Sequence, residues 1–366
     1  MLQLKTTSLL FALTLWAGLL LGGGVGAQVQ VVQVARGFDV PWSLAFLPDG
    51  AILVTERGGV LWRVAPDGAR SRVEGVPRVR VQGQGGLLDV AVARDFANSR
   101  RVYLSYVTDQ PGGSGTALAH ARLSPDGTRL TEVTQIFQMT PGSRGGRHFG
   151  GRIVEAPDGA LFLTIGDRGD SELAQNLQRH NGSVIRIRPD GGVPPGNPLA
   201  DSPGALPEIW SYGHRNPQGA ALDLQGRLWI TEHGARGGDE ANLIRKGANY
   251  GWPVIAYGRH YSGAKIGEGT AKPGMEQPVL YWDPSIAPSG LAFYDGNLFP
   301  HWRGHAFAGS LKFDYIARLS GTPLHESERI QTPETRRVRD IRTGPDGAIW
   351  FLSEDRGALY RIIPAD

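Results

Sequence analysis

The chain has 366 residues, of which 40% are hydrophobic and 20% are charged, and it contains 52 glycines and 25 prolines. This length is enough for one large core or two modest ones, and the glycines and prolines are spread between strand-like runs, which argues against a disordered chain. The net charge is only +3 and no basic run stands out, so nucleic acid is not an expected partner. The sequence has no cysteine, which excludes disulfides and thiolate metal sites.

The first 27 residues differ from the rest and predict a secretory signal peptide. Lys5 precedes an apolar run from Leu9 to Leu21, and the segment ends in small residues at Val25–Ala27. An uncleaved membrane anchor is the alternative, but the apolar run is short for a membrane span. We therefore expect cleavage after Ala27, export to the periplasm or the exterior, and a mature single domain over residues 28–366 without stable membrane insertion.

One pattern recurs six times in the mature chain: an extended run, a turn and a second apolar run. The six copies are Ser43–Arg57, Leu87–Val107, Gly151–Ile165, Ala221–Gly234, Gly290–Lys312 and Asp340–Gly357. Several of the turns contain Asp-Gly, which favours a tight connection between antiparallel strands. Each copy is therefore expected to be a β-hairpin.

Six similar hairpins predict an all-β fold, a six-bladed β-propeller with four short strands in each blade. Long amphipathic helical patterns are nearly absent after the N-terminus. A β-sandwich with extra strands is the alternative, but it gives no reason for six like hairpins. The run Gln28–Val34 is expected to complete the last blade and close the ring.

The hairpins also predict which side chains meet. The residues before the first strand of a hairpin and after its second strand emerge at the same end, and in a propeller those ends face one side of the ring. The residues expected together on that face are Gln84, His148, Asp167, Arg215, Asn216, Glu232–Ala235, Ser285, Lys312, Arg337 and Arg339. The opposite ends carry mostly Pro-Asp-Gly turns, which are structural.

Two chemistries follow from that set. A carboxylate at Asp167 beside the imidazole of His148 suits a general base, although two solvated loop residues would also explain one isolated hairpin. Several arginines and Lys312 around one pocket favour a ligand with several carboxylates or phosphates, such as a quinone cofactor. The acidic segment Gly238–Glu240, followed by Asn249–Trp252, suits a hard cation such as calcium or a solvated turn.

The mature chain resembles the soluble quinoprotein aldose sugar dehydrogenases, relatives of soluble glucose dehydrogenase that use pyrroloquinoline quinone (PQQ). The segments that carry the resemblance are GQGGLLDVA, RHFGGRIVEAPDG, TIGDRG, SYGHRNPQG, TEHGARGGDEANLIRKGANYGWP, APSGLAFY, GSLK and RVRDIRTGPDG. The family fold is a six-bladed propeller, in agreement with the repeat pattern. The resemblance implies oxidation of aldoses at the anomeric carbon to lactones, with hydride transfer to PQQ and electrons passed to an external acceptor.

The resemblance also implies roles for single residues. His148 would take the proton of the anomeric hydroxyl, Asp167 would be its neighbouring carboxylate, and Arg215 would polarise the quinone carbonyl. The residues implied to hold PQQ are Gln84, His148, Arg215, Asn216, Tyr261, Lys312, Arg337 and Arg339.

Two calcium ions are implied as well. The backbone carbonyls of Gly234 and Ala235 would bind the calcium that touches PQQ, and Ala235 stands where soluble glucose dehydrogenase has proline. Glu240, by its side chain, and Tyr250, by its carbonyl, would bind a second, structural calcium. The sugar-side segment YWDPSIAPSG matches only loosely, which makes Trp282 and Ser285 weaker candidates.

Two other functions remain open from the sequence. A calcium-dependent lactonase on the same fold would need a histidine and calcium but not Lys312, Arg337 and Arg339 around a polycarboxylate. A non-catalytic propeller that serves as a binding module would be expected to lose His148 or the arginine pair, and both are present. The sequence leaves open whether the protein is a monomer or a homodimer.

Overall fold

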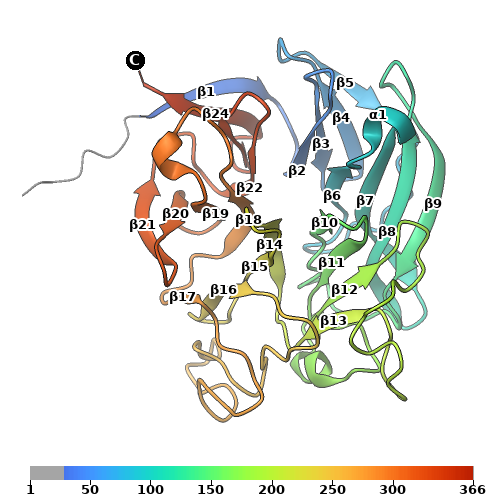
Figure 1. The fold of residues 1–366 in the computed structure, drawn as a ribbon, viewed down its shortest axis with the longest axis vertical. Coiled ribbons are helices and arrows are strands. Elements are labelled where there is room, and N and C mark those ends of the chain that lie inside the picture. Colours follow the sequence, from blue (N-terminus) through green and yellow to red (C-terminus); the bar gives the residue numbers. More distant parts are fainter. Residues whose placement is uncertain (1–28, 366) are drawn as a thin grey trace, which may run out of the picture.

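The computed structural model describes residues 29–365, so the predicted signal peptide lies outside the described residues. Within them the chain forms six four-stranded antiparallel sheets around a common centre (Figure 1). Each sheet is one blade, and the strands nearest the centre contact those of the neighbouring blades to form a closed ring. The predicted six-bladed β-propeller is confirmed.

The strands follow one another from the centre of the ring outward in each blade. The first three blades are β2 (Pro41–Phe46), β3 (Ile52–Glu56), β4 (Val60–Val64) and β5 (Arg70–Val73); β6 (Leu87–Val92), β7 (Arg101–Gln110), β8 (Gly113–Leu123) and β9 (Leu130–Gln138); and β10 (Ile153–Glu155), β11 (Leu161–Ile165), β12 (Ser183–Ile187) and β13 (Ile209–Tyr212). The last three are β14 (Pro217–Leu222), β15 (Leu228–Glu232), β16 (Asp239–Leu243) and β17 (Leu280–Trp282); β18 (Pro288–Phe293), β19 (Ala306–Ser310), β20 (Ile316–Ser320) and β21 (His325–Ile330); and β22 (Val338–Thr343), β23 (Ile349–Ser353), β24 (Ala358–Pro364) and β1 (Val29–Arg36). The short helices are α1 (Phe96–Ser99), η1 (Ser171–Gln175) and η2 (Pro300–Trp302).

The six predicted hairpins are the two inner strands of the six blades. In the third blade, the turn between β10 and β11 has Gly159 at φ 81°, and the amide of Ala160 donates to Oδ1 of Asp158 over 3.0 Å. These contacts explain why Asp-Gly marks the turn. The fourth hairpin begins at Pro217 rather than at Ala221, because Pro-Gln-Gly-Ala lacks the apolar pattern that identifies a strand.

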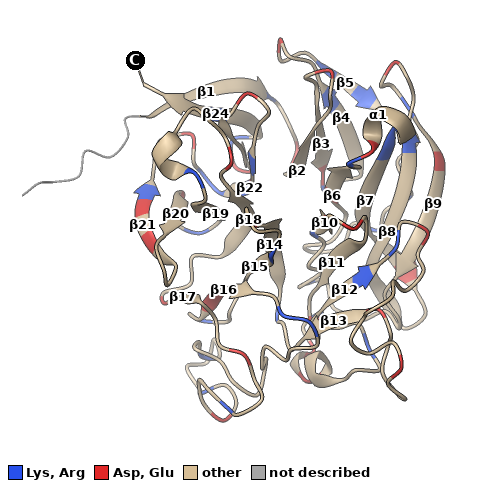
Figure 2. Cartoon of the chain, in the orientation of Figure 1, with Lys and Arg blue, Asp and Glu red and all other residues tan. Residues whose placement is uncertain are grey.

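The second strands of five blades are buried along their whole length because they are covered on both faces. Every residue of β3, β11, β15, β19 and β23 is buried. Neighbouring blades pack face to face, so these strands are mostly apolar and do not alternate between apolar and polar residues. Positive and negative residues are interspersed around the ring (Figure 2), as the small net charge suggests.

The ring is closed by pairing the two ends of the described chain. Strand β1 adds to the outer edge of the sixth blade, antiparallel to β24, with Val29 opposite Pro364 and Arg36 opposite Ala358. The prediction that the leading run closes the ring is confirmed, and the strand extends two residues beyond the predicted end at Val34. No helix among residues 29–365 is long and apolar enough to cross a bilayer.

A buried charge cluster ties the inner strands together at the centre. Arg152, immediately before β10, is 1% exposed, and its Nη1 lies 3.1 Å from Oδ1 of Asp89 in β6 and 3.1 Å from Oδ1 of Asp340 in β22. Its Nε donates to the carbonyl of Gln218 in β14 over 2.6 Å, and its Nη2 donates to that of Arg339 over 3.1 Å. We call Arg152, Asp89 and Asp340 the central arginine network.

The two carboxylates of this network reach further strands. Asp340 accepts the amide of Leu44 in β2 over 3.0 Å, and Asp89 accepts the hydroxyl of Ser43 and the amide of Ile153. In β18, the hydroxyl of Ser289 donates to the carbonyl of Val338 over 2.5 Å. Polar groups therefore link the inner strands of all six blades, where apolar side chains alone would leave buried backbone groups without partners.

We predict that Arg152→Met lowers the free energy of unfolding by about 3 kcal/mol, because Asp89 and Asp340 then share the single guanidinium of Arg342, which lies 3.2 and 3.4 Å from them. Chemical denaturation followed by circular dichroism measures this loss. The control is Arg72→Met, which removes a guanidinium that is 59% exposed and lies 3.6 Å from Glu74. It should change the free energy of unfolding by less than about 0.5 kcal/mol, and equal effects of the two substitutions would contradict the structural role given to Arg152.

Candidate functional site

His148 and Asp167 form a buried pair at one end of the third blade, on the face where the sequence places them. His148 precedes β10 and Asp167 follows β11, and Nδ1 of His148 lies 2.6 Å from Oδ1 of Asp167. The two residues are 8% and 1% exposed. The carboxylate holds the proton on Nδ1, which leaves Nε2 of a neutral imidazole as the basic nitrogen.

Several further contacts fix this pair. The indole Nε1 of Trp252 donates to Oδ2 of Asp167 over 2.8 Å, and the amide of Gly169 donates to Oδ1 over 2.6 Å. The amide of His148 donates to Oε1 of Gln84 over 2.8 Å. His148 has φ 54°, a conformation that non-glycine residues seldom adopt and that often occurs at functional sites.

The surroundings lower the pKa of both members of the pair. Burial lowers the pKa of His148 below its usual value, Asp167 opposes that shift, and the charges of Arg215 and Arg147 add to it. Burial alone would raise the pKa of Asp167, but its hydrogen bond to His148 and the positive charges around it bring the value below the usual range. The imidazole is therefore neutral and the carboxylate is ionised at neutral pH, as a general base requires.

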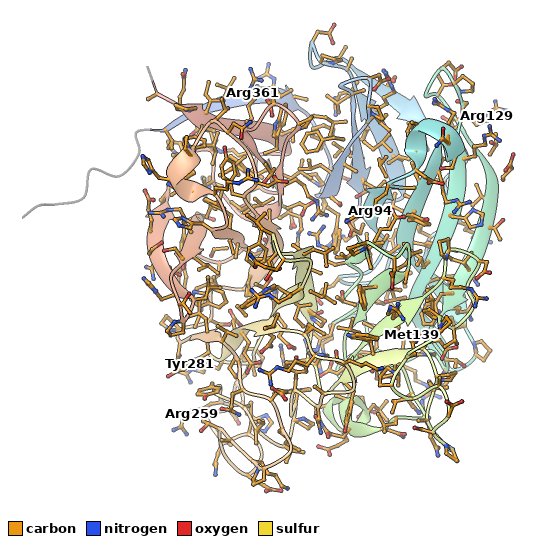
Figure 3. The ribbon with its side chains drawn as sticks, viewed as in Figure 1. Arg94, Arg129, Met139, Arg259, Tyr281 and Arg361 are labelled. Carbon is orange, nitrogen blue, oxygen red and sulfur yellow. The ribbon has the colours of Figure 1, made fainter. Side chains whose placement is uncertain are left out.

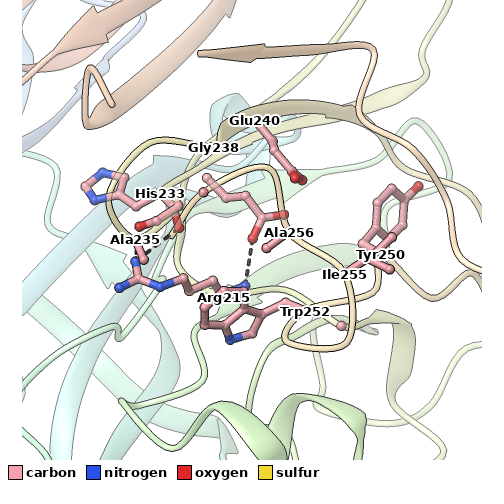
Figure 4. Close-up of a pocket in the computed structure, with 13 residues that line it drawn as sticks. Arg215, His233, Ala235, Gly238, Glu240, Tyr250, Trp252, Ile255 and Ala256 are labelled. Carbon is pink, nitrogen blue, oxygen red and sulfur yellow. Dashed lines mark hydrogen bonds between the residues drawn. The ribbon is translucent and has the colours of Figure 1, made fainter. Parts of the chain in front are cut away.

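Arg215 lies next to this pair and reaches the segment after β15. Its carbonyl accepts the amide of Asp167 over 2.9 Å, and its own amide donates to Oε2 of Glu232 over 2.7 Å. Its Nη1 donates to the carbonyl of His233 over 3.2 Å and also to that of Gly234 (Figure 4). The guanidinium of Arg215 thus donates to the carbonyl of Gly234, one of the two carbonyls for which the sequence predicts a calcium ion.

His233 precedes Gly234 in the chain, and its imidazole contacts a backbone carbonyl. Its Nε2 lies 2.8 Å from the carbonyl of Pro288, and burial, together with the charges of Arg215, Arg339 and His148, lowers its pKa to about 3. The imidazole is neutral. His233 therefore adds no positive charge to the site.

A second acidic group lies behind these carbonyls. Burial, and then the charge of Glu232, raises the pKa of Glu240 to about 8. The side-chain amide of Asn242 donates to both carboxylates, over 3.1 Å to Glu232 and 3.0 Å to Glu240. Glu240 and Tyr250 line a cavity of about 20 Å³, room for one water-sized particle (Figure 4). No cluster of three or more Asp, Glu, His or Cys side chains that could hold a metal occurs within residues 29–365, so a cation here would need backbone or amide oxygens.

Arg337 and Arg339 share one carboxylate at the sixth blade. Nε of Arg337 lies 2.7 Å from Oε1 of Glu354, and Nη2 of Arg339 lies 2.6 Å from Oε2. Nη1 of Arg339 also donates to Oε1 of Gln218 over 2.7 Å. Burial opposes ionisation of Glu354, but the two arginines bring its pKa below the usual value. The pair is therefore held rigidly with one of its two charges balanced.

The other predicted residues are placed as follows. Oδ1 of Asn216 accepts the amide of Gly150 over 3.3 Å, while its buried Nδ2 finds no partner among the described residues. Lys312 is exposed, with its Nζ 4.9 Å from the ring centroid of Phe313. Tyr261 is 76% exposed. Arg259, two residues before it in the chain, lies at the periphery of the molecule (Figure 3).

The two weaker candidates, Trp282 and Ser285, make structural contacts. Nε1 of Trp282 donates to Oε2 of Glu326 over 2.7 Å, and the hydroxyl of Ser285 donates to Oδ1 of Asp239. The same carboxylate group accepts the amides of Gly234 and Ala287 over 2.8 and 2.7 Å. Asp239 thereby fixes the backbone around Gly234.

Three groups complete the site without having been assigned a role from the sequence. Trp252 and Glu354 bind predicted site residues directly, and Asn242 bridges two carboxylates. Glu354 could have been predicted by the rule that identified Asp167, because both residues follow the second strand of a hairpin. Glu354 comes directly after β23, and Asp167 comes two residues after the end of β11. Trp252 lies in the long connection between β16 and β17, whose path no strand pattern predicts.

Several known proteins are similar to this chain in sequence. The chain matches the family model described as glucose/sorbosone dehydrogenase over residues 38–361. It is 44% identical over 348 residues to aldose sugar dehydrogenase YliI of Escherichia coli, which covers 92% of this chain and 94% of that protein. It is 28% identical over 408 residues to quinoprotein glucose dehydrogenase B of Acinetobacter calcoaceticus, covering 88% and 84%.

Two solved structures support the same relationship. The apo-form of the soluble aldose sugar dehydrogenase of Escherichia coli superposes with a TM-score of 0.89 at 42% identity, covering 92% of this chain and all of that one (100%). The PQQ-bound aldose sugar dehydrogenase of Streptomyces coelicolor superposes with a TM-score of 0.77 at 29% identity, covering 92% and 99%. The chain therefore belongs to the glucose/sorbosone dehydrogenase family, which confirms the family and the class of oxidoreductase that its sequence predicts.

Proposed function

We propose that this protein oxidises aldose sugars at the anomeric carbon to lactones, with PQQ and calcium bound, and passes the electrons to an external acceptor. The observation that carries the proposal is the buried His148–Asp167 pair, in which the amide of Asp167 donates to the carbonyl of Arg215. Relatives named as aldose sugar dehydrogenase and quinoprotein glucose dehydrogenase support it.

The polar groups of the site fit a tricarboxylate quinone. Nε of Arg215 and Nδ2 of Asn216 are buried hydrogen-bond donors without partners among the described residues. Such groups are costly unless a ligand satisfies them. Arg337, Arg339, Lys312 and Gln84 would hold the remainder of PQQ through charge-assisted and neutral hydrogen bonds. A lactonase or a neutral-ligand binding module would have no use for this set of cations.

His148 supplies the proton chemistry. Nε2 of its neutral ring would accept the proton of the anomeric hydroxyl, while Asp167 stabilises the imidazolium that results. Trp252 and the amide of Gly169 keep Asp167 ionised and oriented. When bound, PQQ would supply the acceptor for the hydride that leaves the anomeric carbon. General-base assistance of this kind typically contributes ~10²–10⁴-fold in rate.

The oxygen groups of the site suit two calcium ions. The carbonyls of Gly234 and Ala235 would bind one, and the hydrogen bond from Arg215 to the Gly234 carbonyl supports this by placing a positive group at one of these oxygens. Calcium binding requires the guanidinium to leave that carbonyl. Glu240 and the carbonyl of Tyr250 would bind the other, where two carboxylates share Asn242 and a cation would relieve their repulsion.

The proposal includes export of the enzyme from the cytoplasm, with the first 27 residues acting as a signal peptide. Electrons would then be taken up outside the cytoplasm by a diffusible or membrane-bound acceptor. Both the acceptor and export belong to the proposal.

We predict that His148→Ala lowers kcat for glucose oxidation by ~10²–10⁴-fold, because the proton of the anomeric hydroxyl loses its acceptor. Reduction of an artificial electron-acceptor dye by the PQQ- and calcium-loaded enzyme measures the rate. Fluorescence titration should show that the variant still binds PQQ, since the cationic groups remain. A variant with both PQQ binding and full activity would refute the role of His148.

The pH profile should report the neutral imidazole. Since the pKa of His148 lies below its usual value, the rate should fall only as the pH drops below about 6.5, the ordinary histidine value. In Asp167→Asn the raising effect of the carboxylate is lost, so the acid limb should move to lower pH while kcat falls. An acid limb that shifts upward in this variant is incompatible with the proposed pairing.

The second calcium is tested by thermal unfolding. Calcium that binds the folded chain alone raises its melting temperature, and we expect a rise for the apo-protein at millimolar CaCl₂. Glu240→Gln should abolish the part of the rise due to this site, whereas Glu172→Gln, at an exposed position in η1, should retain it. An equal rise in all three proteins would exclude Glu240 as a ligand.

A further inference from the structure

A second hollow lies beside the His148 loop, between the second and third blades, and four arginines line it. They are Arg144, Arg147, Arg168 and Arg179, and we call this hollow the arginine pocket. Its volume is about 690 Å³. None of its four arginines belongs to the site described above.

The positive charge of the arginine pocket is not balanced by neighbouring carboxylates. Within residues 29–365, none of the four guanidinium groups lies within 4.0 Å of a carboxylate. Asp170 is the acidic residue in its lining. By contrast, Arg337 and Arg339 are paired with Glu354 in the neighbouring site. A concave surface with several cations and one carboxylate attracts anions.

Arg168 carries a buried positive charge that no carboxylate within 4.0 Å balances among residues 29–365, which is unfavourable for the stability of the folded protein. The residue is 2% exposed, and its guanidinium donates to the carbonyls of Arg147 and Gly145 and stacks 3.3 Å from the ring centroid of Phe149. Its Nε is buried without a partner among the described residues. Burial lowers its pKa to about 9. A buried cation without a counter-charge is unfavourable unless a ligand supplies the negative charge.

The walls of the pocket are shaped for close approach. Gly169 has φ 81°, and a side chain there would collide with the guanidinium of Arg147. A Cβ on Gly145 would crowd the carbonyl of Arg168 at 2.6 Å. Glycine at these positions lets Arg147 and Arg168 lie against the backbone. The side chains of Arg144, Arg147 and Arg179 form no hydrogen bond within residues 29–365 and are free to bind a ligand.

Two residues of the arginine pocket are neighbours in sequence of the His148–Asp167 pair. Arg147 precedes His148 and Arg168 follows Asp167, so the same two loops carry both sites. The charge of Arg147 contributes to the lowered pKa of His148. An anion beside Arg147 would screen that charge and make His148 a stronger base.

We propose that the arginine pocket binds an oxyanion, either the phosphate or carboxylate of an acidic aldose whose anomeric carbon lies at His148, or the same group on a free small molecule. The first source rests on the proposed dehydrogenase function, whereas the second does not. Arginines in this arrangement bind phosphate and carboxylate through paired, charge-assisted hydrogen bonds.

The first experiment measures binding without any catalysis. Inorganic phosphate is titrated by calorimetry into apo-protein at low ionic strength. The double variant Arg144→Gln/Arg179→Gln should bind roughly tenfold more weakly or worse, because two charged donors are lost. The control is Arg72→Gln/Arg122→Gln, which removes two arginines that are 59% and 51% exposed elsewhere and should leave the affinity unchanged. Undetectable binding by the wild type, or equal binding by both double variants, overturns the proposal.

The second experiment identifies the source of the anion. The ratio of kcat/KM for glucose 6-phosphate to that for glucose is compared in the wild type and in Arg144→Gln/Arg179→Gln. A selective fall of this ratio assigns the pocket to acidic substrates, and an unchanged ratio together with lost phosphate binding assigns it to a free anion. If no sugar is oxidised but phosphate binding is lost only in the Arg144/Arg179 variant, the dehydrogenase proposal fails and the anion site stands.

Discussion

One buried guanidinium sets the geometry on which the rest of the molecule depends. Arg152 joins Asp89 and Asp340 at the centre of the ring, and its bonds reach the inner strands of other blades. It lies four residues after His148, and the carbonyl it holds belongs to Arg339. The same cluster therefore positions the strand that follows the base and the strand that carries a site cation. A buried network of this kind is stable only when every member has its partner.

The arginines near the proposed site are of two kinds, which differ in the groups that hold their side chains. Arg337 and Arg339 are fixed by Glu354, so both are held in position before any ligand binds, whereas Arg215 donates to carbonyl oxygens that a calcium ion would take over. Preorganised groups of this type bind an anionic ligand without the cost of ordering their side chains. The arginines around the neighbouring pocket have carbonyl partners or none, and an anion there would change the electrostatic environment of His148.

The periodic part of the molecule could be predicted from the sequence, and the irregular part could not. Hairpin turns and apolar runs specify where each inner strand ends, which is enough to bring His148 and Asp167 to one end of one blade. The same rule applied after β23 would have identified Glu354. The connection between β16 and β17 obeys no such rule, since its course depends on tertiary contacts. It carries Trp252 onto Asp167 but leaves Tyr261 exposed, and no local pattern distinguishes the two.

A spectroscopic titration bears most directly on whether these loops build one cofactor site beside a base. PQQ is added to the apo-protein with calcium, and the absorbance of the bound quinone is followed before and after glucose is added without oxygen. A shared site predicts saturation at one PQQ per chain, followed by loss of the oxidised quinone spectrum when glucose is added. Failure to saturate, or a bound quinone that glucose leaves oxidised, would contradict it.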